Sequence, residues 1–192
     1  MKNLKVYLIV LIMSMTIGSN SSPVTYSKKS TKTIKILPLG IVNQSVMKNV
    51  TDSVSKYFPN VVVMKKEDMP KEAWYSPRKR YRADKLIHWM SGRAKENEVW
   101  LGITSLDIST TKGTNPDSGI MGLGYMPGNA CIISSYRIRN KSNVYKVAIH
   151  ELGHTLGLPH CKNKECYMRD AEGKDVTGYE KRLCEKCILA FK

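Results

Sequence analysis

Apolar positions along this chain follow two periods, one typical of strands and one typical of helices. Short β-branched or aliphatic runs bounded by Gly, Pro, Asn or Ser predict strands. The predicted strands are residues 34–37, 61–64, 99–104, 119–125 and 130–134. Apolar residues that recur every three or four positions predict helices between them. The predicted helices are one from Val46 to Phe58-Pro59, one over residues 80–96, and one capped by Ser142 or Asn143.

This alternation predicts an α/β fold. Residues 109–118, which are rich in Thr, Gly, Asn and Pro, predict a loop. No internal repeat or low-complexity linker divides the chain, and 192 residues are enough for one hydrophobic core. We therefore expect a single folded domain.

The N-terminus has the charged, apolar and small-residue regions of a secretory signal. Lys2 and Lys5 precede a mostly apolar run over residues 6–17, which is too short to span a bilayer comfortably. We expect a signal peptide at residues 1–21, a short extension at residues 22–33, and a secreted or periplasmic protein. The alternative is an uncleaved signal that tethers the protein to a membrane.

Three of the four histidines lie in the segment HELGHTLGLPH at residues 150–160. Residues four apart lie on one face of a helix, so His150 and His154 can each direct a ring nitrogen to the same metal ion. Glu151 then lies beside that ion. The spacing therefore predicts a zinc-binding helix.

A third ligand requires the chain to turn back. Gly157 suits the backbone conformation that ends a helix, and Pro159 prevents continuation, so His160 can return to the metal. Three neutral imidazoles leave one coordination position open, and zinc in such a site lowers the pKa of water from about 15.7 towards about 7. Glu151 is expected to act as general base and then as general acid towards the leaving amine.

Four cysteines follow this segment in two closely spaced pairs. The pattern reads Cys161-x4-Cys166-x-Met168, then fifteen residues, then Cys184-x2-Cys187. Such pairs suit a tetrahedral thiolate zinc site. Two disulfides are the alternative if the chain is exported.

Together these motifs resemble the signature of the archaemetzincins, a branch of the metzincin metalloproteases. That signature joins HExxHxxGx3C to Cx4C, a Met and a final CxxC, although the interval between Met168 and Cys184 is shorter here than is usual. Weaker matches lie upstream in the expected order, at residues 36–40, residues 101–104, Asp107 and Ser134-x2-Arg137. The resemblance thus covers most of the chain after residue 33.

The resemblance implies a metzincin-like α/β (α+β) fold with a mixed twisted sheet, two upper helices and a central zinc-binding helix. Residues 34–192 would form the catalytic domain, with an upper subdomain at 34–157 and a small lower subdomain at 158–192. Peptide substrates of metzincins bind as an added strand, for which residues 119–125 or the following strand are the candidate edge.

The resemblance also implies two zinc ions, one catalytic and one structural. The implied catalytic ligands are His150, His154 and His160. The implied structural ligands are Cys161, Cys166, Cys184 and Cys187. Met168 is implied as the Met-turn residue, an apolar floor beneath the histidines; the alternative is one of ten methionines that fill core space.

The chain is strongly basic, with a formal net charge of +15. Removal of residues 1–21 takes away Lys2 and Lys5 and no acids, which leaves +13. This charge favours anionic surfaces as partners. The densest basic cluster, residues 77–82, is interpreted as a solvated helix start in preference to a nucleic-acid patch.

The leading hypothesis is therefore a monomeric zinc metallopeptidase that acts on peptides or proteins. Two alternatives remain at this point. One is a zinc-stabilised binding protein on a protease-like scaffold, and the other is a hydrolase of a non-peptide amide or ester.

Overall fold

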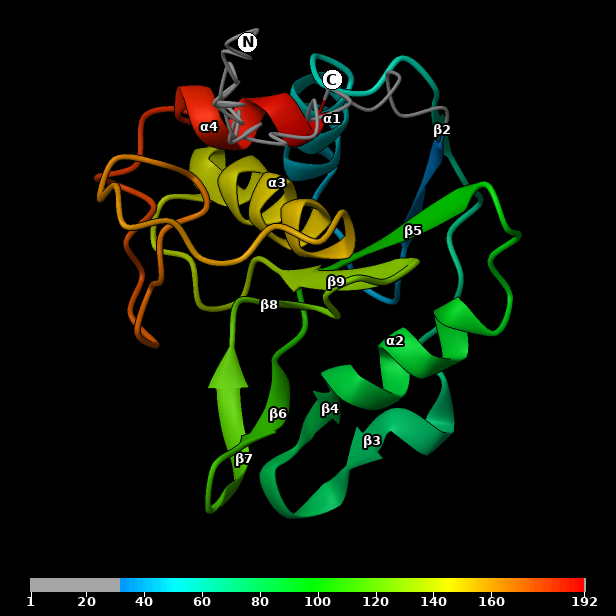
Figure 1. The fold of residues 1–192 in the computed structure, drawn as a ribbon. Coiled ribbons are helices and arrows are strands. Elements are labelled where there is room, and N and C mark those ends of the chain that lie inside the picture. Colours follow the sequence, from blue (N-terminus) through cyan, green and yellow to red (C-terminus); the bar gives the residue numbers. More distant parts are fainter. Residues whose placement is uncertain (1–31, 192) are drawn as a thin grey trace, which may run out of the picture.

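A five-stranded sheet forms the centre of residues 32–191, the part of the chain that the computed structural model describes. In spatial order its strands are β2 (Val61–Val63), β1 (Thr33–Pro38), β5 (Glu98–Thr104), β9 (Ala130–Ser134) and β8 (Gly122–Gly124). The first four run parallel, and β8 pairs antiparallel with β9 (Figure 1). The predicted mixed sheet is confirmed, whereas the predicted signal peptide lies outside the described residues.

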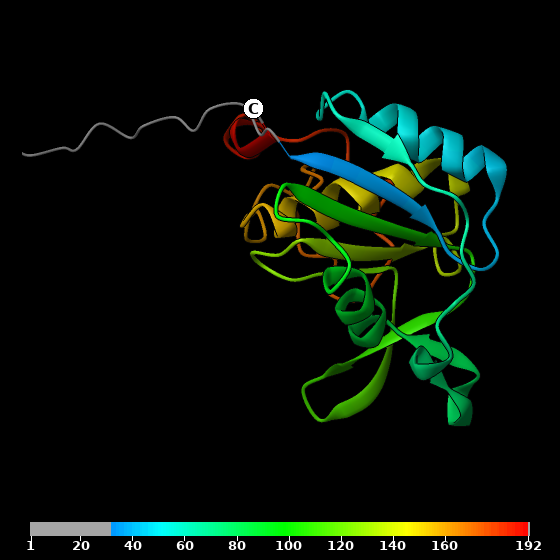
Figure 2. The same ribbon diagram turned by 90° about the vertical axis from the view of Figure 1, so that its right-hand side faces the viewer.

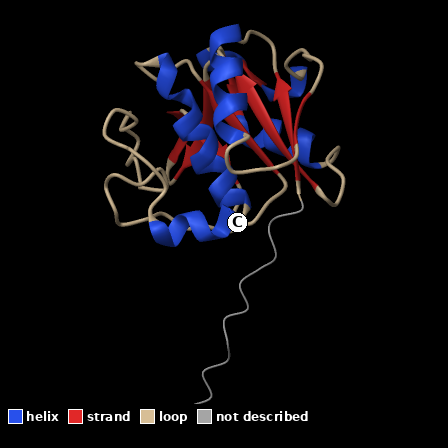
Figure 3. Cartoon of the chain, turned by 90° about the horizontal axis from the view of Figure 1, so that it is seen from above, coloured by secondary structure: helices blue, strands red, loops and turns tan. Residues whose placement is uncertain are grey.

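Helices cover both faces of this sheet, as Figures 1 and 2 show. Helices α1 (Gln44–Val54) and α3 (Val144–Thr155) pack on one face, and α2 (Ala83–Ser91) packs on the other. The short helix α4 (Glu185–Ile188) lies on the side of α1 and α3, which cross over the strands in Figure 3. Single turns of 3-10 helix occur at Lys71–Ala73, Ser76–Arg78, Lys141–Asn143 and Leu189–Phe191.

Side chains of β1 reach both layers because strand residues alternate between faces. Ile34 and Ile36 are fully buried with α1 and α3, and Leu37 is fully buried with α2. The parallel central strands are therefore apolar on both faces, which explains why the sequence showed them as continuous apolar runs.

A second, smaller sheet corrects the prediction of a loop at residues 109–118. Its strands, in spatial order, are β3 (Trp74–Tyr75), β4 (Arg80–Arg82), β6 (Ile108–Lys112) and β7 (Asn115–Ile120). Strands β6 and β7 form a hairpin that turns at Gly113, where φ is +56°. Pro116 is tolerated because β7 is an edge strand, and the polar composition reflects a hairpin whose tip, residues 111–116, is exposed.

The basic cluster at residues 77–82 is not a solvated helix start, so that interpretation was wrong. Arg80 to Arg82 form β4, and α2 begins only at Ala83. The side chains of Arg80 and Arg82 are only 11% exposed and pair with acids, among them Asp117 at 3.8 Å from each. Asp117 comes from the hairpin, more than thirty residues along the chain, so no local pattern could indicate it.

The start of α3 also differs from its prediction. Asn143 stands at the N-cap position but makes no side-chain hydrogen bond there. Asn140 instead caps the preceding 3-10 turn by accepting a hydrogen bond from the Ser142 amide at 3.1 Å. Within residues 32–191, no helix has the length and apolar character needed to cross a bilayer.

Candidate metal centres

The C-terminal end of α3 has the geometry that the glycine spacing predicted. The amide of Leu158 donates to the Gly153 carbonyl and the amide of Gly157 donates to the His154 carbonyl, each at 2.9 Å. Gly157 has a φ of +89°. These two bonds and the positive φ define a Schellman motif, which turns the chain so that His160 returns to the face of the helix.

Three histidines meet at this turn. One ring nitrogen from each of His150, His154 and His160 lies within 4.8 Å of the other two. The Nε2 atoms of His150 and His154 are 3.0 Å apart. All three rings, which come from α3 and the segment after it, therefore direct nitrogens into one small volume, as three ligands of one metal ion would.

The other ring nitrogen of each histidine faces an oxygen. Nδ1 of His150 lies 2.7 Å from the Tyr167 carbonyl, and Nδ1 of His154 lies 2.8 Å from the Leu158 carbonyl. Nδ1 of His160 lies 3.4 Å from Oδ2 of Asp170. These contacts favour the tautomer with Nδ1 protonated and leave Nε2 as a free electron-pair donor.

Burial also keeps the first two imidazoles neutral. It lowers the pKa of His150 to about 4, with a smaller effect from the neighbouring His154. Burial likewise lowers the pKa of His154. Neutral imidazole is the form that binds metals, so the environment favours the ligand state near neutral pH.

Glu151 lies between α3 and the edge strand β8. The residue is only 7% exposed. Burial raises the pKa of its carboxyl to about 8, and a hydrogen bond from the Gly124 backbone opposes this rise. A carboxyl with a pKa near neutrality can both accept and donate a proton during one reaction.

The four C-terminal cysteines form a second cluster. Their sulfur atoms all lie within 4.8 Å of one another, and none of the described cysteines forms a disulfide. The Sγ atoms of Cys161 and Cys184 are 3.8 Å apart. A tetrahedral zinc site with Zn–S bonds of about 2.3 Å has S···S edges of about 3.8 Å, so this spacing fits a metal and is far too long for an S–S bond.

Backbone contacts connect the two clusters. The Cys161 amide donates to the Met168 carbonyl at 2.7 Å, and Cys161 follows His160 directly. Met168 is fully buried. It packs closely against α3, since a Cβ at Gly153 would lie 2.4 Å from its sulfur. The side chain thus packs beneath the helix turn that carries His150 and His154.

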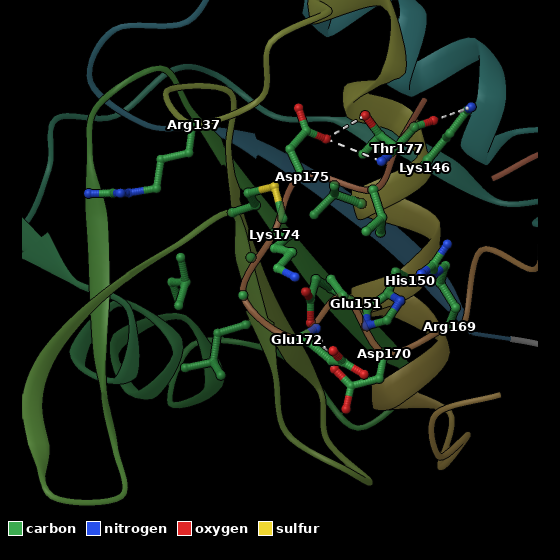
Figure 4. A pocket seen from close by; sticks show the side chains of 18 of the residues that line it. Arg137, Lys146, His150, Glu151, Arg169, Asp170, Glu172, Lys174, Asp175 and Thr177 are labelled. Carbon is green, nitrogen blue, oxygen red and sulfur yellow. Dashed lines mark hydrogen bonds between the residues drawn. The ribbon is translucent and has the colours of Figure 1, made fainter. Parts of the chain in front are cut away.

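A cavity of about 1000 Å³ opens in front of the histidines (Figure 4). It is bounded by α3, by β8 and by the segment from Arg169 to Glu180. Strand β8 lies within the segment 119–125 that was predicted as the substrate edge, and it has no further strand beside it in the described sheet. Gly119 and Ile120 instead complete β7.

Sequence reasoning did not find several residues that shape this cavity. They include Lys146, Asp170 and Glu180. Lys146 alone left a signal, since it lies four residues before His150 and thus on the same helix face. The others reach the cavity through tertiary packing.

One helix presents two histidines and a glutamate beside a third histidine, beneath the edge strand of a mixed sheet. This arrangement defines a zinc metallopeptidase of the zincin class. The particular family follows from comparison with known proteins. The chain belongs to peptidase family M54, whose model it matches over residues 32–192.

Its relatives agree with this assignment. The archaemetzincin of Halobacterium salinarum is 32% identical over 171 residues, which cover 80% of this chain and 96% of that protein. The crystal structure of archaemetzincin from Archaeoglobus fulgidus, complexed with malonate, is 27% identical with a TM-score of 0.69 and covers 82% of this chain and 99% of that one. The archaemetzincin structure from Methanopyrus kandleri is 27% identical with a TM-score of 0.70, covering 85% and 96%. The chain is thus a zinc metallopeptidase, as predicted, rather than a binding protein on a protease-like scaffold.

Proposed function

We propose that this peptidase hydrolyses peptide bonds with Glu151 as general base and with His150, His154 and His160 as the ligands of the catalytic zinc. The convergence of three imidazole nitrogens beside a buried carboxylate is the observation that carries the proposal. Zinc in a three-histidine site activates water and polarises the scissile carbonyl.

Glu151 then transfers the proton. Its carboxylate takes a proton from the attacking water and delivers it to the nitrogen of the leaving amine. Burial raises the pKa of Glu151 to about 8, and a carboxyl with a pKa near neutrality can both take up and release a proton. A hydrogen bond from the Gly124 backbone on β8 favours the charged form of this carboxylate.

The substrate peptide is proposed to pair with β8 as an additional antiparallel or parallel strand. The edge position of β8 and its place along the cavity support this binding mode. Main-chain hydrogen bonds would then fix the peptide, and side-chain pockets would select among sequences. The reaction chemistry alone also permits a non-peptide amide or ester, but an edge strand has donors and acceptors spaced for a peptide backbone.

A second zinc is proposed at Cys161, Cys166, Cys184 and Cys187, which brings the count to two per chain. The sulfur spacing and the absence of disulfides among the described cysteines support it. Met168 is proposed as the apolar floor of the catalytic site.

We further propose a monomer that is secreted or periplasmic and that associates with anionic surfaces. The N-terminal pattern of residues 1–21 supports export, and the net charge of +15 supports association with anionic surfaces. Mass spectrometry of the mature chain recovered from the producing cell tests the cleavage site. An N-terminus at Met1 on the mature protein would contradict it.

The proposed mechanism is tested by Glu151→Gln, with Glu172→Gln as the matched control at an exposed acid on the same cavity. We expect Glu151→Gln to keep its zinc, as measured by elemental analysis, and to lose hydrolysis of an unbiased peptide library by at least about 100-fold. Glu172→Gln should remain active. Equal turnover by Glu151→Gln and the wild type would refute a catalytic role for this carboxylate.

A further inference from the structure

The cavity extends along α3 from His150 towards the N-terminus of the helix. Lys146 and Val147, one turn before His150, line this part. Val176 and Glu180, on the segment that follows the methionine turn, line it from the opposite side. A side chain of a peptide bound beside the histidines would enter this recess, so its chemistry bears on substrate choice.

Lys146 links the two walls of the recess by hydrogen bonds. The residue is only 8% exposed, and its Nζ donates to the backbone carbonyls of Thr177 and Glu180, each at 2.6 Å. Its charge is thus solvated mainly by carbonyl oxygens. Lys146 is in this way a structural residue that fixes the position of Glu180.

Glu180 is the unusual group. It is 6% exposed, yet within residues 32–191 its carboxylate makes no hydrogen bond and no ion pair within 4.0 Å. Its oxygens are not among the fully sealed polar atoms, so the carboxylate keeps contact with the cavity that it lines. A buried carboxylate without a protein donor is costly, so a donor that enters this cavity would stabilise it.

The neighbouring acid Asp175 is already engaged, since it accepts from the Thr177 hydroxyl at 2.7 Å and from the Arg139 amide at 2.8 Å. Arg169 donates from Nη1 to the Lys164 carbonyl at 3.0 Å, and its buried Nε has no hydrogen-bond partner among the described residues. Glu180 is therefore the acid in this recess that retains its full hydrogen-bonding capacity for a ligand.

We propose that Glu180 is the floor of a subsite that binds a lysine or arginine side chain of the peptide substrate, adjacent to the scissile bond. The walls of the recess suit such a side chain, since Val147 and Val176 provide apolar surface for its aliphatic part. The ammonium or guanidinium group would then donate charge-assisted hydrogen bonds to Glu180. This specificity rests on the proposed peptidase function.

The test compares wild type, Glu180→Gln and Glu172→Gln on a peptide library, followed by paired peptides that differ only in Lys or norleucine beside the cleaved bond. The wild type should favour Lys or Arg at one position flanking the bond. Glu180→Gln should lower the kcat/KM ratio of the Lys peptide to the norleucine peptide by about tenfold or more. Glu172→Gln should leave the ratio unchanged.

A binding measurement separates this inference from the catalytic proposal. Zinc-loaded Glu151→Ala, titrated with the same two peptides by calorimetry, should bind the Lys peptide more tightly, and the added Glu180→Gln change should abolish the difference. Equal binding of both peptides, or a library profile without basic residues, would overturn the subsite. Absence of any cleavage by the wild type together with tighter Lys-peptide binding would instead refute the peptidase mechanism and keep the subsite.

Discussion

Gly122 on the edge strand lies directly against the carboxylate of Glu151. A Cβ at Gly122 would stand 2.6 Å from Oε1 and 2.7 Å from Cγ of Glu151. A Cβ at Gly124 would likewise stand 2.7 Å from the Glu151 carbonyl oxygen. The glycines of β8 therefore permit the strand to touch α3, and the proposed base and the proposed substrate edge form one packed unit.

This contact makes Gly122→Ala a specific test of the geometry. The added methyl group must displace the carboxylate or the strand, and a displacement of about 1 Å can cost about 100-fold in rate. We expect kcat/KM for a library-derived peptide to fall by that order while zinc content is unchanged. Gly178→Ala is the control, because a Cβ there meets nothing within 4 Å. Full activity in Gly122→Ala would show that the carboxylate does not need this position.

A second glycine contact concerns stability. A Cβ at Gly153 would lie 2.4 Å from Sδ and 2.8 Å from Cε of Met168, which is fully buried and has little room to move. Gly153→Ala should therefore destabilise the zinc-loaded protein by about 1–3 kcal/mol in urea unfolding, despite the helix preference for alanine. In a Met168→Ala background the same change should cost much less. Additive effects of the two substitutions would contradict the contact.

The zinc-binding window could be predicted because its determinants are local. The four-residue spacing of His150 and His154 and the glycine at 157 specify helix, turn and return within eleven residues. The β6–β7 hairpin could not be predicted in this way, because its threonines and turn residues show no alternation of apolar and polar positions. The partners of Arg80 and the carboxylate of Glu180 depend on segments that meet only in the folded chain.

Glu180 also predicts a pH dependence of stability. Its pKa is raised to about 7, chiefly by burial; Lys146 and Arg169 oppose the rise and Asp175 adds to it. Because the folded-state pKa exceeds the unfolded value of about 4.5, folding favours the protonated form. The stability of the wild type relative to Glu180→Gln should thus be highest below about pH 4.5 and decline as pH rises to about 7. Urea unfolding of both proteins across this range measures it, and a difference that does not change with pH would contradict the raised pKa.

The bond between His160 and Cys161 predicts that the two metal centres are coupled. Cys161→Ser should remove one ligand from the thiolate cluster and lower the zinc content from two ions per chain to one. It should also lower peptide kcat/KM, because the residue next to His160 no longer binds zinc. The loss should be smaller than for Glu151→Gln, because His160 itself is retained. Cys131→Ala is the control for zinc content. Cys131 is buried and belongs to neither group of candidate ligands, so this variant should keep two zinc ions.

Thiol titration of the wild type, in denaturant with a chelator and without reductant, distinguishes a zinc site from two disulfides at these four cysteines. Five reactive thiols are expected, because all five described cysteines are free. A single reactive thiol would mean that the four cysteines form two disulfides, which would remove the structural zinc and leave the three-histidine site intact.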